Sequence, residues 1–162
     1  MDNDKPNRAQ NKSSNAEEAD AKIHSDKGIE RTNTDAFAKD AFCYAFGALP
    51  ASFTGQMEAR SKVHTAATMA GMAFTQAGLG ICHALSHSLG GMFHIPHGRL
   101  NAILLPSVVG CNAHAAGRKY AELARASGMG GSSESMGVRN LKAGLLRLRR
   151  ELGLPETLAK AG

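Results

Sequence analysis

The sequence predicts an all-α protein, a helical bundle that occupies residues 33–162. From Asn33 onward, apolar residues recur at intervals of three and four, which places them on one face of a helix. The alternating apolar and polar pattern of half-buried strands is missing. Residues 1–32 contain almost no large apolar side chain, so we expect them to form a disordered or loosely structured arm.

The first two predicted helices form the N-terminal part of the bundle. Asn33 or Thr34 is expected to cap the first helix, and Pro50 is expected to end it. The second is expected to begin near Met57 and to continue to about residue 77. Its small side chains, which suit a close approach of two helices, are Ala66, Ala67, Gly71, Ala73 and Ala77.

Four further helices are predicted after residue 77. A helix that carries histidines is expected to be broken by the pair Gly90 and Gly91, and the next opens near Gly98. A short helix over KYAELARASG ends at Gly128, and the stretch over residues 128–135 is expected to be a flexible connector. The last helix is the clearest, and Gly153 closes it. Its apolar residues are Val138, Leu141, Leu145, Leu148 and Leu152.

Composition and charge exclude several classes of protein. The formal net charge is +5, and the Lys and Arg residues are spread without interleaved aromatic residues, so we expect no binding to nucleic acid. The three cysteines are widely spaced, which fits reduced thiols in the cytoplasm better than a disulfide framework. No apolar run is long enough for a membrane span, and no secretory signal follows the first Met. We therefore expect a cytoplasmic protein that binds no membrane.

The candidate functional residues are histidines. Four of the seven histidines lie between positions 83 and 97. His83 and His87 are four residues apart, so on a helix they project from one face. The glycine pair and the proline that follow allow the chain to turn and bring His97 back beside that face. Neutral imidazole is a common ligand of zinc and iron, so this set indicates a metal site, with ordinary packing or surface histidines as the alternative.

The stretch over residues 80–106, GICHALSHSLGGMFHIPHGRLNAILLP, resembles the signature of the iron-containing (group III) alcohol dehydrogenases. That signature reads G-x-x-H-x-x-x-H-x-L-G-x(5)-P-H-G-x-x-N-A-x-x-L-P, and every fixed position is present. The similarity extends from about Asn33 to LGLPETLAKAG near the end of the sequence. The variant FHIPHGRLNAILLP is similar to the enzymes of the ethanolamine and propanediol utilisation type. The resemblance implies that residues 33–162 form part of the helical metal-binding (dehydroquinate synthase-like) domain of this family.

The resemblance also implies an activity and a set of site residues. It implies oxidation of a small alcohol, or reduction of an aldehyde, with NAD(P) and a divalent iron or zinc ion that acts as a Lewis acid. By position, His83 and His97 resemble two of the family's metal ligands. His87 resembles a histidine of the pocket that positions substrate or relays a proton, and Asn101 is expected to hydrogen-bond locally. Three other histidines match no ligand of the family and are expected in surface or packing positions: His64, His94 and His114.

Two parts of the family's pattern are not found in the sequence. The remaining ligands of the family lie on an Asp-x-x-x-His helix; Asp20 and His24 have that spacing, but the family's register falls nearer Ser14 and Glu18, so their assignment stays open. No strand followed by a glycine-rich phosphate loop precedes the helical part. We therefore expect a truncated form that lacks the nucleotide-binding domain and is inactive as a dehydrogenase by itself.

Two functions from different classes follow from the sequence. The first is a metal-dependent alcohol dehydrogenase. The second is a catalytically inactive helical remnant that binds metal weakly or acts as a protein-interaction module, because two histidines hold a metal less well than a complete ligand set. Apolar faces such as that of Phe37, Phe42 and Phe46 are expected to be exposed and to favour a homo-oligomer. The particular alcohol, NAD against NADP, and iron against zinc are not specified.

Overall fold

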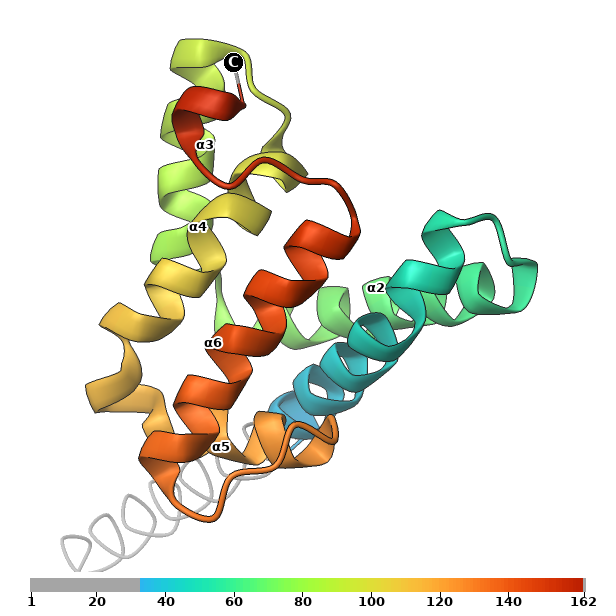
Figure 1. The fold of residues 1–162 in the computed structure, drawn as a ribbon, viewed down its shortest axis with the longest axis vertical. Coiled ribbons are helices and arrows are strands. Elements are labelled where there is room, and N and C mark those ends of the chain that lie inside the picture. The colour runs from blue at the N-terminus through green and yellow to red at the C-terminus, as the bar shows by residue number, and fades with distance from the viewer. Residues whose placement is uncertain (1–32, 162) are drawn as a thin grey trace, which may run out of the picture.

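The computed structural model describes residues 33–161, which contain helices and no strand, and this confirms the predicted all-α class. The predicted arm over residues 1–32 lies outside the described residues. Figure 1 shows the described elements, which are a helix over residues 33–53, α2 (Met57–Ala77), α3 (Ile81–Phe93), α4 (His97–Cys111), α5 (Ala113–Ala126), α6 (Glu134–Glu151) and the short 3-10 helix η1 (Leu158–Lys160). None of the described helices combines the length and apolar character that a membrane crossing requires.

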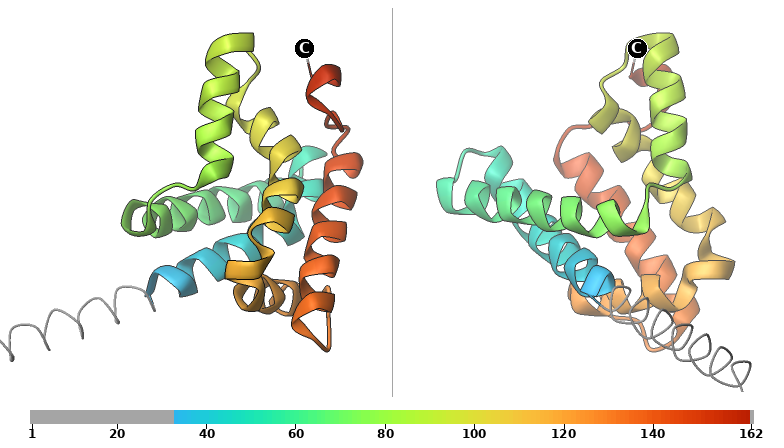
Figure 2. Two further views of the ribbon diagram at one scale, coloured as in Figure 1. Left: turned by 90° about the vertical axis from the view of Figure 1, so that its left-hand side faces the viewer. Right: turned by 180° about the vertical axis from the view of Figure 1, so that it is seen from behind.

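The helix over residues 33–53 and α2 form a hairpin that projects sideways from the bundle of α3, α4 and α6 (Figure 1 and Figure 2). The buried residues of both helices are small, which lets the two backbones approach closely. In α2 they are Ala59, Ala66 and Ala73, and in the preceding helix they are Ala41, Ala48 and Ser52. Nη2 of Arg60 also donates a hydrogen bond of 3.2 Å to the carbonyl oxygen of Ser52.

The hydrophobic core lies where α4, α5 and α6 meet. Its buried centre consists of Val109, Ala124 and Leu141, one residue from each helix. Side chains that pack against this centre are Phe42, Tyr120, Leu123, Met129, Val138 and Leu145. The apolar face predicted for the last helix is thus the face that α6 buries, and Leu141 is only 1% exposed.

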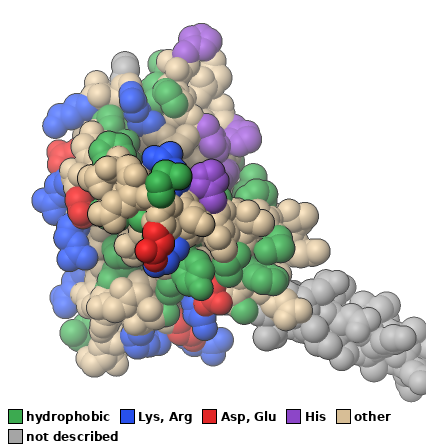
Figure 3. All heavy atoms as spheres, turned by 90° about the vertical axis from the view of Figure 1, so that its right-hand side faces the viewer, with side chains coloured by type: hydrophobic (Ala, Val, Ile, Leu, Met, Phe, Trp, Pro, Cys, Tyr) green, Lys and Arg blue, Asp and Glu red, His purple; other side chains and the backbone are tan. Residues whose placement is uncertain are grey.

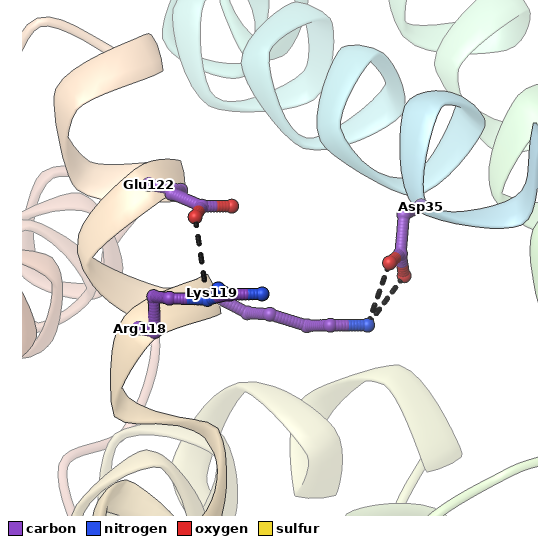
Figure 4. Close-up of polar contacts among 4 residues, drawn as sticks. All are labelled: Asp35, Arg118, Lys119 and Glu122. Atoms are coloured by element: carbon purple, nitrogen blue, oxygen red, sulfur yellow. Dashed lines mark hydrogen bonds and ion pairs between the residues drawn. The ribbon is translucent and has the colours of Figure 1, made fainter. Parts of the chain in front are cut away.

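A charged contact joins the first described helix to α5. Nζ of Lys119 donates to both carboxylate oxygens of Asp35, at 2.7 and 2.6 Å (Figure 4). Within α5, Arg118 and Glu122 form a longer ion pair of 3.7 Å (Figure 4). Both partners of the Asp35–Lys119 pair are more than half exposed, so it stabilises the fold by at most about 1 kcal/mol.

Several predicted helix boundaries differ in the structure. The first described helix does not end at Pro50 but continues to residue 53, because proline removes only its own N–H and its carbonyl still accepts from Thr54 at 3.2 Å. Similarly, α4 continues through the buried Pro106. The helix predicted over KYAELARASG begins six residues earlier, at Ala113. Where the first described helix begins, and therefore the predicted cap at Asn33 or Thr34, is not decided by the described residues.

The prediction that the glycine pair breaks the histidine-bearing helix is wrong. α3 runs through Gly90 and Gly91 to Phe93, and the helix ends at His94, whose φ of 53° is left-handed and whose N–H bonds to the carbonyl oxygen of Gly90 at 3.0 Å. A Cβ at Gly90 would lie 3.4 Å from the carbonyl oxygen of Ile95 and 3.5 Å from Cδ1 of Leu100, which are ordinary van der Waals distances. The contacts around Gly90 therefore leave room for a side-chain Cβ, and α3 continues through both glycines.

The phenylalanine face predicted to be exposed is mostly covered. Phe37 is 39% exposed, but Phe42 and Phe46 are half-buried and their rings stack with centroids 5.6 Å apart. Both line an apolar cavity of about 370 Å³ between the first described helix, α4 and α6. The prediction of exposure is therefore wrong for these two rings, because α4 and α6 supply apolar partners for them.

Candidate metal centre

The pairing of α3 with α4 brings three imidazole rings together. His83 and His87 lie one turn apart on α3, and His97 is the first residue of α4. The ring centroids of His83 and His97 are 5.3 Å apart, with an angle of 44° between the ring planes. Those of His87 and His97 are 4.7 Å apart, and the rings are nearly perpendicular at 83°. On the face shown in Figure 3, histidine side chains gather over the upper part of the molecule.

The turn between α3 and α4 aims His97 at the α3 histidines. Ile95 is 7% exposed and anchors the turn in the protein interior. Pro96 precedes the helix with φ −55° and ψ 131°, and its carbonyl oxygen accepts the N–H groups of Arg99 and Leu100 at 3.0 and 3.2 Å. Because the proline ring fixes this φ, it restricts the direction in which the chain enters the first turn of α4. The predicted return of His97 to the α3 face thus follows from a local, proline-directed turn.

The surroundings of His83 favour its neutral form. Burial, and to a smaller extent the neighbouring rings of His97 and His87, lower the pKa of His83 below its ordinary value. A neutral imidazole has a nitrogen lone pair to offer, which is the form that binds a metal ion. His83 therefore remains a competent donor at a pH where an ordinary histidine would begin to protonate.

The spacing of His83 and His97 fits a shared metal ion. With a metal–nitrogen bond of about 2.0–2.1 Å and a further distance of about 1.1 Å to the ring centre, two imidazoles in a tetrahedral site have centroids about 5.2 Å apart. The observed separation is 5.3 Å. The donor chemistry also fits, because imidazole suits both iron and zinc. The separation of the two ring centroids is therefore close to the value that two imidazole ligands of one ion would have.

A partly buried polar network connects His97 to α3. Nδ2 of Asn101 is 2.8 Å from Nε2 of His97, while Oδ1 of Asn101 accepts from Oγ of Ser86 at 2.9 Å and from Sγ of Cys82 at 3.4 Å. Ser86 is fully buried, and burial raises the pKa of the Cys82 thiol. Sequence reasoning anticipated a local bond for Asn101 but missed Ser86 and Cys82. Their four-residue spacing on one face of α3 was the available signal.

The other predicted candidates do not join this cluster. His64, His94 and His114 are exposed, as the sequence predicted for surface histidines. Asp20 and His24 lie outside the described residues. Among residues 33–161, no group of three or more His, Cys, Asp or Glu side chains is arranged to hold a metal ion. The assignment of His83 and His97 as ligands, and of His87 as a catalytic residue, stays a prediction.

Comparison with known proteins identifies what this helical arrangement is similar to. A sequence model of the Fe-containing alcohol dehydrogenase family, C-terminal, matches residues 29–162. The chain is 40% identical over 134 residues to the bifunctional aldehyde-alcohol dehydrogenase of Escherichia coli. This match covers 70% of this chain and 15% of the relative. It is 50% identical over 99 residues to the 1-propanol dehydrogenase of Salmonella typhimurium. That match covers 59% of this chain and 27% of the relative.

A solved structure shows the same fold. The crystal structure of a 1,3-propanediol oxidoreductase superposes with a TM-score of 0.76 at 35% sequence identity, over 80% of this chain and 35% of that chain. This chain thus spans between 15% and 35% of the length of the three relatives named here. The match to the family model covers the three histidines and the helices that carry them.

Proposed function

Since the chain belongs to the iron-containing alcohol dehydrogenase family, we propose that it is the metal-binding part of an NAD(P)-dependent alcohol dehydrogenase that acts on a small alcohol or aldehyde. The names of two relatives, a 1-propanol dehydrogenase and a 1,3-propanediol oxidoreductase, support small substrates. The three cysteines are free, which supports a reducing, cytoplasmic location. The observation that carries the proposal is the separation of 5.3 Å between the rings of His83 and His97.

Each histidine of the cluster has a proposed role. His83 and His97 would hold Fe²⁺ or Zn²⁺, which supplies Lewis-acid stabilisation of an alkoxide when bound. His87 is exposed and its ring meets that of His97 edge to face, so it can contact a substrate without leaving the cluster. We assign His87 to substrate positioning or to proton transfer at the substrate oxygen. Burial lowers the pKa of His83, which favours the neutral form of this imidazole that can bind a cation.

Hydride transfer also requires a bound nicotinamide. Residues 33–161 include no strand that is followed by a glycine-rich loop, so none of them is assigned to the cofactor. The complete dehydrogenase reaction is therefore proposed for the protein in which this helical part acts together with a nucleotide-binding part.

A second candidate function is a helical module that binds metal weakly or contacts another protein, including a second copy of itself. Large apolar side chains on the surface favour it: Met57 is 75%, Met92 71% and Phe53 68% exposed. Sedimentation of the purified chain at several concentrations tests self-association through these side chains. A mass equal to one chain throughout would exclude a homo-oligomer, whereas a dimer abolished by Met57→Lys or Phe53→Lys would support it.

Metal content tests the first candidate directly. The chain is reconstituted anaerobically with Fe²⁺ or Zn²⁺, dialysed, and analysed for bound metal beside His83→Ala, His97→Ala and the matched control His64→Ala, an exposed histidine of α2. We expect about one ion per wild-type chain, a similar value for the control, and at least a tenfold weaker affinity for the two cluster variants, as loss of a ligand requires. Equal metal content in all four proteins would contradict the proposal.

A further inference from the structure

The carboxamide of Asn101 contacts both α3 and the ring of His97. Asn101 lies one turn after His97 on α4, and its Nδ2 approaches Nε2 of that ring at 2.8 Å. Its Oδ1 faces α3, where Ser86 is 2.9 Å and Cys82 is 3.4 Å away. These contacts join residues that are 15 and 19 positions apart, so they depend on the pairing of α3 with α4.

The donors on α3 decide which way the amide points. The hydroxyl of Ser86, which is fully buried, and the thiol of Cys82 both donate to the same oxygen. A carboxamide has one accepting and one donating edge, so the edge that remains for His97 is the NH₂ group, which can only donate. Nε2 of His97 must therefore be the unprotonated nitrogen, and the proton of the neutral ring must be on Nδ1.

We propose that Asn101 is a positioning residue that sets the tautomer of His97, and that Ser86 and Cys82 act through it. The network holds the neutral ring with its proton on Nδ1 and with the lone pair of Nε2 directed at the amide. The tautomer itself is argued from the hydrogen bonds, and only its consequence for metal binding rests on the proposed function. If His97 is a metal ligand, its Nε2 can accept an ion without losing a proton. An ion bound at Nε2 would take the place of the hydrogen bond from the amide of Asn101.

An isosteric substitution of Asn101 should reverse the tautomer of His97. In Asn101→Asp, both edges of the side chain accept, so the ring of His97 has to donate from Nε2 and its proton moves to that atom. The ¹⁵N chemical shifts of the two ring nitrogens, measured on the metal-free protein well above the pH range of imidazole titration, report the tautomer. We expect about a tenfold excess of the Nδ1–H form in the wild type, the value of one net hydrogen bond, and an excess of the Nε2–H form in the variant.

Two serine variants complete the experiment. Ser86→Ala removes the stronger donor and should shift His97 toward a mixture of tautomers, and it tests the inference even if Asn101→Asp does not fold. Ser88→Ala is the matched control, because Ser88 is an exposed residue of α3 that donates to the carbonyl oxygen of Ala84 at 3.1 Å. An excess of the Nε2–H form in the wild type would overturn the inference. So would a tautomer ratio that Ser86→Ala leaves unchanged.

A zinc titration of the same proteins separates this inference from the proposed function. The tautomer is measured without metal, so a wild-type chain that shows the Nδ1–H form but binds no Zn²⁺ would contradict the metal site and leave the inference standing. A chain that binds Zn²⁺ through the histidine cluster but carries the proton on Nε2 in its metal-free form would overturn the inference and leave the metal site standing. We expect the Nδ1–H form together with Zn²⁺ binding.

Discussion

Replacing Gly137 by alanine tests how closely α5 packs on α6. A Cβ at Gly137 would lie 2.5 Å from Cβ and 2.6 Å from Cα of Ala121, a residue that is 1% exposed. Carbon atoms pack at about 3.5–4.0 Å, so the two helices would have to separate by about 1 Å. The atoms in the way belong to the backbone and the Cβ of Ala121, which cannot rotate aside. The strain therefore reaches the core centre formed by Ala124 and Leu141.

The expected magnitude follows from two opposing contributions. Overpacking of a core costs about 1–3 kcal/mol, and alanine gains about 1 kcal/mol over glycine in a helix interior. With a backbone clash, the net effect of Gly137→Ala should be a loss of about 1–2 kcal/mol in the free energy of unfolding. Gly71→Ala in α2 is the matched control, because no atom lies within 4 Å of the added Cβ. That variant should gain up to about 1 kcal/mol.

Urea denaturation of the metal-free proteins, followed by far-ultraviolet circular dichroism, measures both changes. In a separate thermal scan, the loss expected for Gly137→Ala would appear as a fall of about 2–8 °C in the thermal midpoint. If Gly137→Ala were as stable as Gly71→Ala, the close contact between α5 and α6 would be wrong.

Two further predictions concern the support of the histidine cluster. Leu100 is 0% exposed on α4, and Leu100→Ala should lower the free energy of unfolding by about 2–5 kcal/mol in the same denaturation assay, because it leaves a cavity in the interior; a loss below about 1 kcal/mol would contradict its burial. Cys82 is buried with a raised pKa and Cys111 is exposed, so iodoacetamide at pH 8 should label Cys111 well before Cys82, as judged by mass spectrometry of timed digests. Faster labelling of Cys82 would show that the α3–α4 interface opens.

The features that the sequence predicted correctly depend on local spacing. The last helix was predictable because its apolar residues repeat over about four turns, and α6 buries that face around Leu141. The meeting of His97 with His83 was predictable because one proline-directed turn separates their helices. In both cases neighbours in sequence are also neighbours in space.

The features that were missed depend on which side chains meet when the helices pack. Gly90 looked like a helix breaker, but α3 continues through it to Phe93. Ser86 looked like a minor polar residue of α3, yet it reaches Asn101 on the next helix. The exposure predicted for Phe42 and Phe46 failed for the same reason, because only the fold shows that α4 and α6 cover these rings. Spacing along one helix does not encode the partner that a side chain meets.

The central claim, that His83 and His97 hold one metal ion, is tested most directly by anomalous scattering from crystals grown with Zn²⁺. The account predicts a single strong peak about 2.0–2.1 Å from a ring nitrogen of each of these two histidines. A peak at His64, His94 or His114 alone, or none between α3 and α4, would contradict it.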